Sequence, residues 1–441
     1  MNRFSNTLLR EVLQDKGYIR GPFGSALLRS ELISTGIPVY EQQHAIRGIR
    51  EFRFFIGDEK YIELKRFSTS PGDLIISCSG TVGEISMITK DDPLGIISQA
   101  LLILRTDPEV MIPEFLRYYL ITRQGKHAIT TASHGSVQVN IAPRKVVENI
   151  ELPLPTIIEQ KTISNILGTL DRKIELNKKN NMTFEDIAKS LFKSWFVDFD
   201  PVKAKSEGRS TGLPDEISDL FPDSFENSEL GKIPLGWKII SLKEMLETIS
   251  ETYSIKNKKE VVFLNTGDIE SGKFLTSSYS STKGLPGQAK KSIVKGDILF
   301  SEIRPKNNRH AYVYFDASDY VVSTKLMVLR SRFRENSLFE YFLITQKSSI
   351  NYLQLLAESR SGTFPQITFS ELNAIQFALP KNNHLINFFT NNFLDSIYSK
   401  SQNIKEYNKN LEEIRDTFLP KLISGELRIP DAEKMIEEVG I

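Results

Sequence analysis

The sequence has very little cysteine and no long hydrophobic run. It contains one Cys and five His among 441 residues, and a lone thiol forms neither an internal disulfide nor a paired-cysteine metal site. The five His lack the spacing of zinc ligands, so we expect no bound metal. No stretch approaches the roughly 18 apolar residues of a membrane span, and the N-terminus lacks a signal-peptide core. We therefore expect a cytoplasmic protein that makes no membrane contact.

An excess of charge of either sign is also lacking. Lys and Arg number 56 against 55 Asp and Glu, which gives a formal net charge of +1. Since a dedicated nucleic-acid binder usually has a clear basic excess, any DNA binding here must be local. The hydrophobic fraction of 40% is sufficient for packed cores. The length predicts about two to four domains.

Catalytic motifs are missing as well. The sequence has no GxxxxGK(S/T) loop, no GxGxxG after a strand and no GxSxG elbow. It also has no Asn-Pro-Pro-aromatic or Asp-Pro-Pro-aromatic tetrapeptide, with which amino-methyltransferases hold the target amine. We predict a chain with no catalytic residue and no cofactor of its own.

An internal repeat organises the chain. PGDLIIS at residues 71–77 returns as KGDILFS at 295–301, and ISQALLILR at 97–105 returns as VSTKLMVLR at 322–330. Three further matches follow in the same order, and all five lie at an offset of 223 to 227 residues. This period is far longer than the roughly 20–50 residues of a solenoid unit, so a whole domain with its appendage is duplicated.

The repeat predicts an α+β fold with pseudo-two-fold symmetry, in which two globular β-rich domains are joined by two long coiled-coil helices. β-rich segments are expected at residues 73–77, 85–88 and 96–104 of the first copy. Thr156 and Glu159 form a capping-box sequence that predicts the start of a helix. Eight of the 37 residues at 200–236 are Pro or Gly, which marks a connecting segment. The predicted parts are the first domain (1–155), the first helical region (156–199), the linker (200–236), the second domain (237–380), the second helical region (381–424) and a C-terminal tail (425–441).

Both predicted helices carry a core stripe that averages 3.5 residues per step, the coiled-coil value. The two stripes coincide when one helix is shifted by 223 residues along the sequence. Asn177 then matches Lys400, and a polar residue at such a core position would fix the register of the helix pair. The alternative is that each stripe is the buried face of an ordinary amphipathic helix. The pattern leaves the pairing direction open. The predicted spacer residues are Leu170, Ile174, Asn177, Asn181, Phe184, Leu191 and Trp195 in the first helix, and Ile397, Lys400, Ile404, Tyr407, Leu411, Ile414 and Phe418 in the second.

Local charge favours DNA binding. Residues 283–309 contain seven basic residues against two acidic ones. In the first copy, several Arg residues lie near the turn at 21–24 and the amide pair Gln42-Gln43. Arg and Gln have the fork geometry that reads guanine and adenine edges in the major groove. A basic run alone is more often a solvated face, but here one occurs in each repeat.

The junction between the copies resembles that of type I restriction-modification specificity subunits. FVDFDPV at residues 196–202, GLP at 212–214, LFPDSF at 220–225 and LGKIPLGW at 230–237 are similar to that family. LDRKIELN at 170–177 and KLISGEL at 421–427 are also similar to it. The resemblance covers essentially the whole chain.

That resemblance implies a non-catalytic subunit in which two target-recognition domains each read half of a split double-stranded DNA sequence. It implies that the helices set the half-site spacing and dock two modification subunits, and that restriction subunits can join the complex. S-adenosylmethionine, ATP and Mg²⁺ would then bind to the partner subunits. The alternatives are a methylation-only or other phage-defence system, a helical scaffold that binds no DNA, and a stand-alone nuclease.

The predicted DNA-contacting residues lie in turns beside the repeated segments, and for each of them the alternative is scaffold packing. The sequence does not determine which bases they read or how long the spacer is. The first copy contributes Arg20, Phe23, Ser25, Gln42, Gln43, Ser79, Thr81, Gln99, Ser136, Gln138 and Asn140, and the second contributes Arg304, Lys306, Asn308, Arg309, Thr324, Lys325, Thr363 and Gln366.

Overall fold

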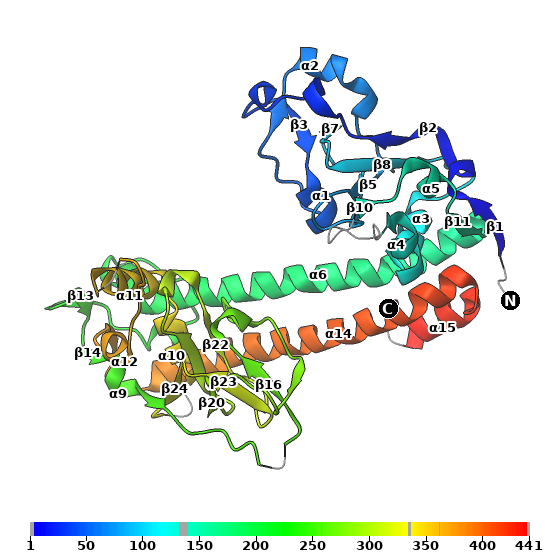
Figure 1. Cartoon of the computed structure of the whole chain (residues 1–441). Coiled ribbons are helices and arrows are strands. Elements are labelled where there is room, and N and C mark those ends of the chain that lie inside the picture. The colour runs from blue at the N-terminus through cyan, green and yellow to red at the C-terminus, as the bar shows by residue number, and fades with distance from the viewer. Residues whose placement is uncertain (1–3, 132–139, 257, 334–336, 361, 439–441) are drawn as a thin grey trace. The chain divides into compact units, whose positions relative to one another are not determined.

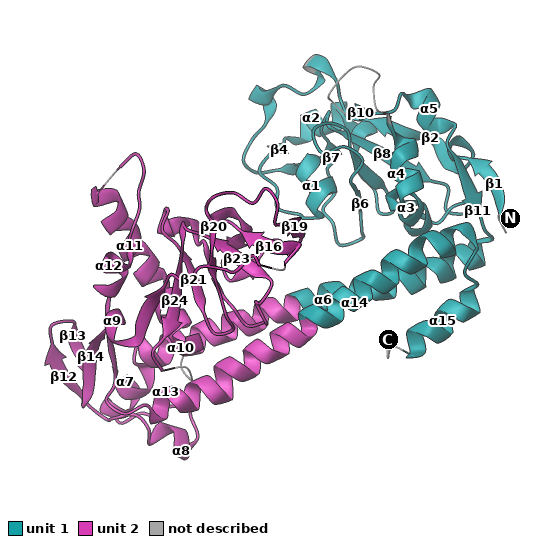
Figure 2. Ribbon diagram, turned by 60° about the horizontal axis from the view of Figure 1, so that its bottom comes forward, with its two compact units in different colours: residues 1–178, 405–441 teal, residues 179–404 magenta. Residues whose placement is uncertain are grey.

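The structure, a computed structural model, describes residues 4–131, 140–256, 258–333, 337–360 and 362–438 (Figure 1). The chain forms two compact units, which are residues 1–178 with 405–441, and residues 179–404 (Figure 2). Two long helices, α6 (Ile157–Phe196) and α14 (Asp395–Ser424), each contribute to both units. Each unit therefore contains one globular domain and one part of each long helix.

The first domain is built around an antiparallel sheet of order β2-β8-β5-β6. Its central strands β5 (Leu74–Ser77) and β8 (Leu101–Thr106) are almost completely buried. Alternate side chains enter two different cores: Leu74 and Ile76 face one, and Ile75 faces the other. The outer strands are β2 (Leu13–Arg20) and β6 (Ile85–Met87).

One face of this sheet is covered by a smaller sheet of order β4-β3-β7, in which β3 and β7 are parallel. The other face packs on α3, α4 and the start of α6. The predicted β segment 96–104 is corrected, because the chain turns at residues 98–100 and forms two strands in different sheets. The remaining elements are β1 (Ser5–Leu8), β3 (Ile37–Tyr40), α1 (Gln42–Arg47), β4 (Phe55–Ile56), α2 (Asp58–Glu63), β7 (Ile96–Ile97), α3 (Pro113–Ile121), α4 (Arg123–Ile129), β9 (Thr130–Thr131), β10 (Asn140–Ile141), α5 (Arg144–Glu148) and β11 (Glu151–Leu154).

The second domain repeats this plan. Its main sheet has the order β15-β24-β21-β22, and its second sheet, β19-β16-β23-β20, again contains one parallel pair, β16 with β23. The strands and helices of this domain are β14 (Trp237–Ser241), α9 (Leu242–Met245), β15 (Leu246–Ile249), β16 (Glu260–Leu264), β17 (Ile269–Glu270), β18 (Lys273–Phe274), β19 (Tyr279–Ser281), β20 (Ala289–Ser292), β21 (Ile298–Ser301), β22 (His310–Tyr312), β23 (Tyr320–Ser323), β24 (Leu326–Ser331), α10 (Ser337–Ile344), α11 (Lys347–Arg360), α12 (Phe369–Asn373) and β25 (Gln376–Pro380).

A buried ion pair occurs at the same place in both main sheets. Asp73 accepts two hydrogen bonds from Arg105, at 2.7 and 2.8 Å. Asp297 accepts two from Arg330, at 2.7 and 2.9 Å. Bidentate Arg–carboxylate pairs fix orientation as well as distance. The repeat seen in the sequence is thus a repeat of topology and of internal contacts.

The first long helix begins and ends where the sequence predicted. Thr156 and Glu159 form the predicted capping box, with the Glu159 amide donating to Thr156 Oγ1 at 3.3 Å and the Thr156 amide donating to Glu159 Oε2 at 3.0 Å. α14 is preceded without a break by α13 (His384–Phe389) and a π-helical turn (Thr390–Leu394).

Within unit 1, the two long helices are antiparallel. Asp171 accepts a hydrogen bond from Arg415 at 3.2 Å, and Asn177 donates to Asn408 Oδ1 at 2.7 Å. Residue numbers therefore rise along α6 as they fall along α14, which settles the direction that the heptad pattern left open.

Five of the seven residues predicted for the α6 stripe are buried, namely Leu170, Ile174, Asn177, Asn181 and Trp195. Phe184 and Leu191 are half-buried.

Two of the seven positions predicted for the α14 stripe are wrong by one residue. Leu411 and Phe418 are buried and Ile397 and Ile404 are half-buried, as expected, but Lys400 is exposed. The buried stations between them are polar or small side chains, Ser401 and Asn408. Tyr407 is the half-buried neighbour of Asn408, and Ile414 is half-buried as well. Neighbouring helix positions differ by about 100°, so a stripe drawn through the most apolar residues lies beside the face of α14 that is buried.

Two predicted boundaries also need correction. Segment 200–236 is not a solvated linker, because Val202, Phe221 and Ile233 lie in the core of unit 2. The tail at 425–441 contains helix α15 (Ile429–Glu438), whose Ala432 and Ile436 are buried in the core of unit 1. Both segments are polar in composition, and a few well-spaced apolar residues are enough to dock them. The elements within the first segment are α7 (Asp200–Ser206), α8 (Asp215–Ser218), β12 (Phe225–Ser228) and β13 (Gly231–Pro234).

Candidate nucleic-acid interface

In the first domain, four of the predicted turns lie together. Gly21 fits tightly against the turn after β7, because a Cβ at Gly21 would lie 2.0 Å from the carbonyl oxygen of Ser98. The Gln42 side chain lies over Gly80, where an added Cβ would be 3.4 Å from Gln42 Nε2. Ser98 donates its amide to the carbonyl of Tyr40, two residues before Gln42, at 2.8 Å. The segments around residues 20–23, 42, 79–81 and 98–99 thus form one surface.

Arg20 lies in the middle of this surface. Its guanidinium carbon is 5.6 Å from the centroid of the Phe23 ring, and Phe23 is 63% exposed. Burial raises the pKa of the Cys78 thiol to about 11, although the positive charge of Arg20 acts in the opposite direction. Among the described residues, neither Arg20 Nη1 nor Gln42 Nε2, both buried, has a hydrogen-bond partner. Unpaired buried donors are costly, and an acceptor from a ligand would satisfy them after a small rearrangement.

The other predicted residues of this domain differ in exposure. Ser79, Thr81, Gln99 and Asn140 are exposed, and Gln43 is half-buried. Ser136, Gln138 and the side chain of Ser25 lie outside the described residues. Two arginines that the sequence associated with this region hold the domain together instead.

These two arginines are Arg50 and Arg53. Arg50 forms an ion pair with Asp92 at 2.8 Å and donates to the carbonyl of Met87 at 3.0 Å. Arg53 makes two hydrogen bonds to Glu41, at 2.6 and 2.7 Å.

In the second domain, three predicted segments also meet. Ile303 bridges to Gln366 in antiparallel fashion, and Arg304 donates its amide to the carbonyl of Pro365 at 3.1 Å. Glu302 donates its amide to the carbonyl of Lys325 at 3.1 Å. Residues 302–309, 324–325 and 363–366 therefore form one rim at the end of β21 and the start of β24.

The rim holds its basic residues in two different ways. Arg304 is exposed, with a left-handed φ of 45°, and Lys306, Asn308 and Thr363 are exposed as well. Arg309, by contrast, donates to the carbonyls of Gly267 and Ile269, at 3.2 and 3.1 Å.

Lysines show the same division. Lys325 is exposed, 3.6 Å from Glu302, beside the half-buried Thr324 and Gln366. Lys291, which the basic run included, donates to the carbonyls of Thr324 and Leu326, and burial lowers the pKa of its ammonium.

The list of predicted contact residues omitted Phe364, which the structure places on this rim. It is 53% exposed between Thr363 and Pro365. Its position directly after Gly362-Thr363, which match Gly135-Ser136 of the first copy, was the signal available in the sequence.

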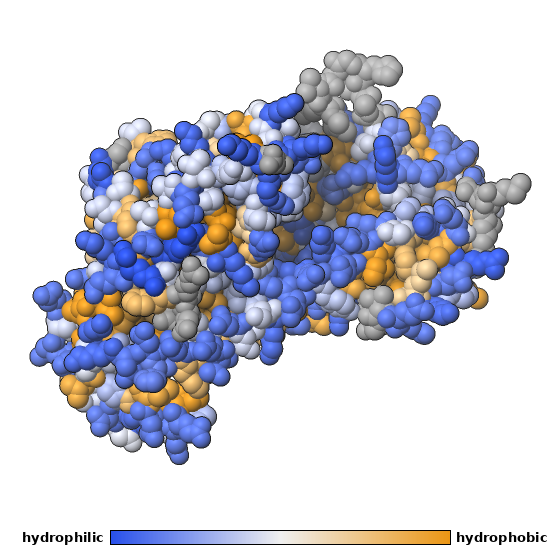
Figure 3. All heavy atoms as spheres, turned by 90° about the horizontal axis from the view of Figure 1, so that it is seen from below, coloured by the Kyte–Doolittle hydropathy of each residue, from blue (hydrophilic) through white to orange (hydrophobic). Residues whose placement is uncertain are grey.

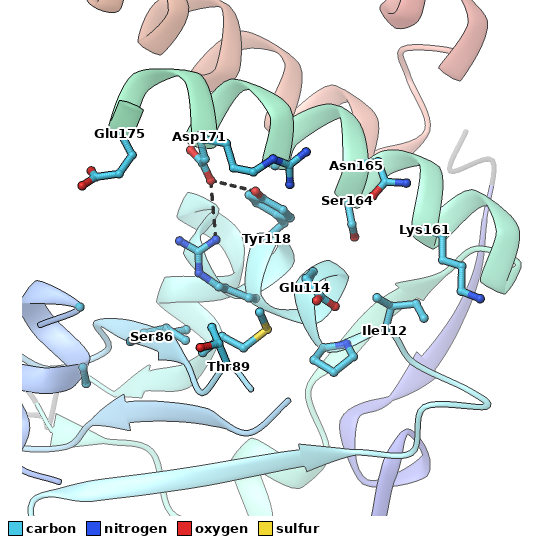
Figure 4. Close-up of a pocket in the computed structure, with 18 of the residues that line it drawn as sticks. Ser86, Thr89, Ile112, Glu114, Tyr118, Lys161, Ser164, Asn165, Asp171 and Glu175 are labelled. Carbon is cyan, nitrogen blue, oxygen red and sulfur yellow. Dashed lines mark hydrogen bonds and ion pairs between the residues drawn. The ribbon is translucent and has the colours of Figure 1, made fainter. Parts of the chain in front are cut away.

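A separate cleft of about 1010 Å³ lies in unit 1, between α6 and the first domain (Figure 4). Figure 4 shows Asp171 pointing from α6 toward α3, where it accepts a hydrogen bond from the Tyr118 hydroxyl at 2.8 Å and lies 3.7 Å from Arg117. These contacts tie the domain to its helix. No group of three or more His, Cys, Asp or Glu able to hold a metal occurs in the described part of the chain. None of the helices built from described residues has the length and apolar character needed to span a membrane.

The family model of the type I restriction modification DNA specificity domain matches residues 32–185 and 234–413. The chain belongs to this family. The two matched ranges correspond to the two copies, so the specificity-subunit resemblance read from the junction motifs is confirmed.

Two similar proteins are specificity subunits of type I restriction enzymes. The chain is 45% identical over 147 residues to the type I restriction enzyme HindI specificity subunit of Haemophilus influenzae, a match that covers 33% of this chain and 32% of that relative. It is 25% identical over 329 residues to the MjaIX specificity subunit of Methanocaldococcus jannaschii, covering 73% and 70%. The crystal structure of the type I restriction-modification S subunit from M. genitalium has a TM-score of 0.55 at 17% identity and covers 96% of this chain and 97% of that one. This likeness supports the predicted α+β fold with two domains and long helices.

Proposed function

We propose that this specificity subunit reads a bipartite double-stranded DNA target, with one half-site recognised by each domain. The observation that carries the proposal is that turns meet on one surface in both copies, although the two copies have diverged in sequence. In each domain, turns that are distant in the sequence meet on one surface, which presents the exposed Gln99 in the first domain and the exposed Arg304, Lys306 and Lys325 in the second. Such side chains supply the donors and acceptors that discriminate base edges.

The two long helices would set the spacing between half-sites and dock two modification subunits. Fixed spacing requires fixed register, and buried polar pairs specify register because a shifted alignment leaves them unsatisfied. Asn177 with Asn408 forms such a pair, and Asn181 donates to the carbonyl of Ser401 at 3.3 Å within unit 2.

We propose no catalytic role for the chain itself. S-adenosylmethionine, ATP and Mg²⁺ would act on the modification subunits and on any restriction subunits that join, and the complex would work in the cytoplasm. A recognition subunit of a methylation-only or other phage-defence system is the alternative within the same class.

The first experiment is a genome-wide map of N6-methyladenine with and without the gene. Loss of methylation at one split sequence would reveal both half-sites, and exchange of residues 1–150 for those of a relative should then change only one half. An unchanged map would contradict the proposal if the purified chain, together with its modification subunits, also showed no salt-dependent binding to duplex DNA.

A further inference from the structure

Three phenylalanines are more than half exposed among the described residues: Phe23 at 63%, Phe333 at 54% and Phe364 at 53%. Leaving an aromatic ring in water forgoes the free energy of burying about 150–250 Å². The face drawn in Figure 3 is mostly hydrophilic, with apolar residues in scattered patches. A single exposed apolar residue is common on protein surfaces, so it is the position of each ring that can indicate a ligand.

Phe23 and Phe364 lie on the two candidate DNA-reading surfaces, one per domain. Phe23 follows the tightly packed turn at Gly21 and stands beside the Arg20 guanidinium. Phe364 stands in the segment whose neighbours Pro365 and Gln366 are held against Arg304 and Ile303. Both rings are therefore carried on backbone that is fixed within its domain.

Phe333 provides an internal contrast. It follows the far end of β24, whereas Lys325 precedes the near end, and a six-residue strand spans about 20 Å. Phe333 lines a cavity of about 420 Å³ with Met245, Phe339 and Ile386, away from the reading surface.

The chemistry of adenine methylation supplies a use for an exposed ring beside the bases. An enzyme that modifies a base inside a duplex must extrude it from the stack, at a cost of a few kcal/mol. Apolar side chains, Phe among them, enter base steps and occupy the unstacked space. A subunit that grips the half-site is well placed to supply such a side chain in trans to the methylating subunit.

We propose that Phe23 and Phe364 are wedge residues, each of which enters the base stack of its own half-site and stabilises the extruded target adenine. Neither ring touches the reacting atoms, so both are positioning residues. The proposal rests on the proposed DNA-recognition function and adds a step that base reading alone does not require.

The test uses the complete complex of this chain with its modification subunits. The target adenine of one half-site at a time is replaced by 2-aminopurine, whose fluorescence rises when it leaves the stack. The variants are Phe23→Ala and Phe364→Ala, each with a Leu version that keeps an apolar wedge. The matched controls are Phe333→Ala and, on α2 of the first domain, Ile62→Ala, since Ile62 is 71% exposed.

We expect each Ala variant to lower the extruded population about tenfold, the value for losing one aromatic–base stack, and only in its own half-site. The Leu variants should restore part of the signal, and both controls should behave as wild type. Wild-type fluorescence in both Ala variants would contradict the wedge proposal. This holds even if DNA affinity fell, because the rings would then only contact base edges such as a thymine methyl group. Equal loss at both half-sites would also overturn it. If the wild-type complex fails to bind the mapped sequence at all, the recognition function itself is wrong.

Discussion

The two globular domains share their buried skeleton and differ at the rim. Both contain the same four-stranded sheet order and the same Asp–Arg pair, Asp73 with Arg105 and Asp297 with Arg330. The surfaces differ: the first domain presents the exposed Phe23 and Gln99 beside the half-buried Arg20, whereas the second presents the exposed Arg304 and Lys306 from the loop after β21. The comparison shows that the loops have diverged while the sheet that positions them stays constant.

One internal position departs from this rule. Arg117 on α3 corresponds to Glu340 on α10. Arg117 lies 3.7 Å from Asp171, whereas Glu340 is buried, its Oε2 has no hydrogen-bond partner among the described residues, and burial raises its pKa to about 8. The duplicated helix has thus exchanged a paired cation for a buried carboxylic acid.

The largest effect should come from breaking the shared ion pair in one domain only. Asp73→Asn removes the carboxylate that pairs with Arg105 and should destabilise the first domain by about 3 kcal/mol, whereas Asp297→Asn should cost less, because Arg330 also lies 3.5 Å from Glu251. Hydrogen exchange should show loss of protection in the domain that carries the substitution. Equal loss in both domains for either variant would show that the two copies unfold as one unit.

The next effect tests the departure at Glu340. A carboxyl whose pKa is raised from 4.5 to about 8 in the folded state contributes stability that is fully present below pH 4.5 and is lost as pH rises through 8. Glu340→Gln removes this loss, so the variant should gain up to about 1.4 kcal/mol over wild type for each pH unit between about pH 5 and pH 8.

The measurement is the difference in unfolding free energy between Glu340→Gln and wild type at each pH. This difference cancels other groups, such as His310, whose pKa burial lowers to about 4. A difference that does not vary with pH would contradict the assignment.

A smaller effect separates the two arginines of the second rim. Arg304→Gly suits the left-handed backbone and should weaken DNA binding by about 1–2 kcal/mol while relaxing only the second half-site. Arg309→Ala should instead lower the stability of the domain, because it removes hydrogen bonds to the carbonyls of Gly267 and Ile269. Binding selections with randomised half-sites check the first variant and thermal unfolding checks the second. A relaxed half-site in Arg309→Ala alone would reverse these roles.

Sequence reasoning predicted the duplication and the start of α6, because each rests on a local signal or on the repeat. It could not separate an arginine that is exposed, such as Arg304, from one that is held by backbone carbonyls, such as Arg309, since their sequence surroundings are alike. It also took the polar segment 200–236 for a linker, because composition does not reveal which few apolar residues dock.

The error in α14 has a similar cause. A frame chosen by hydrophobicity selects Tyr407 and Ile414, yet the buried station belongs to Asn408, whose amide donates to the carbonyl of Ile174 at 3.2 Å and whose Oδ1 accepts from Asn177. A heptad assignment based on hydrophobicity cannot identify a buried position that is occupied by a polar residue. The contacts between α6 and α14 decide which positions of α14 are buried, and only the structure shows those contacts.

The smallest predicted effect tests which residues of α14 occupy the buried positions of the helix pair. Asn408→Ala leaves the buried amide of Asn177 without its acceptor and should cost about 1 kcal/mol, whereas Lys400→Ala, at an exposed position, should stay within about 0.5 kcal/mol of wild type. Chemical denaturation of both variants gives the two values. The stripe predicted from the sequence places Lys400 between the two helices. It therefore predicts the larger loss of stability for Lys400→Ala. Because Ala favours a helix more than Asn or Lys does, helix propensity cannot account for a loss in either variant, and only a larger loss in Asn408→Ala supports the buried pair as the register lock.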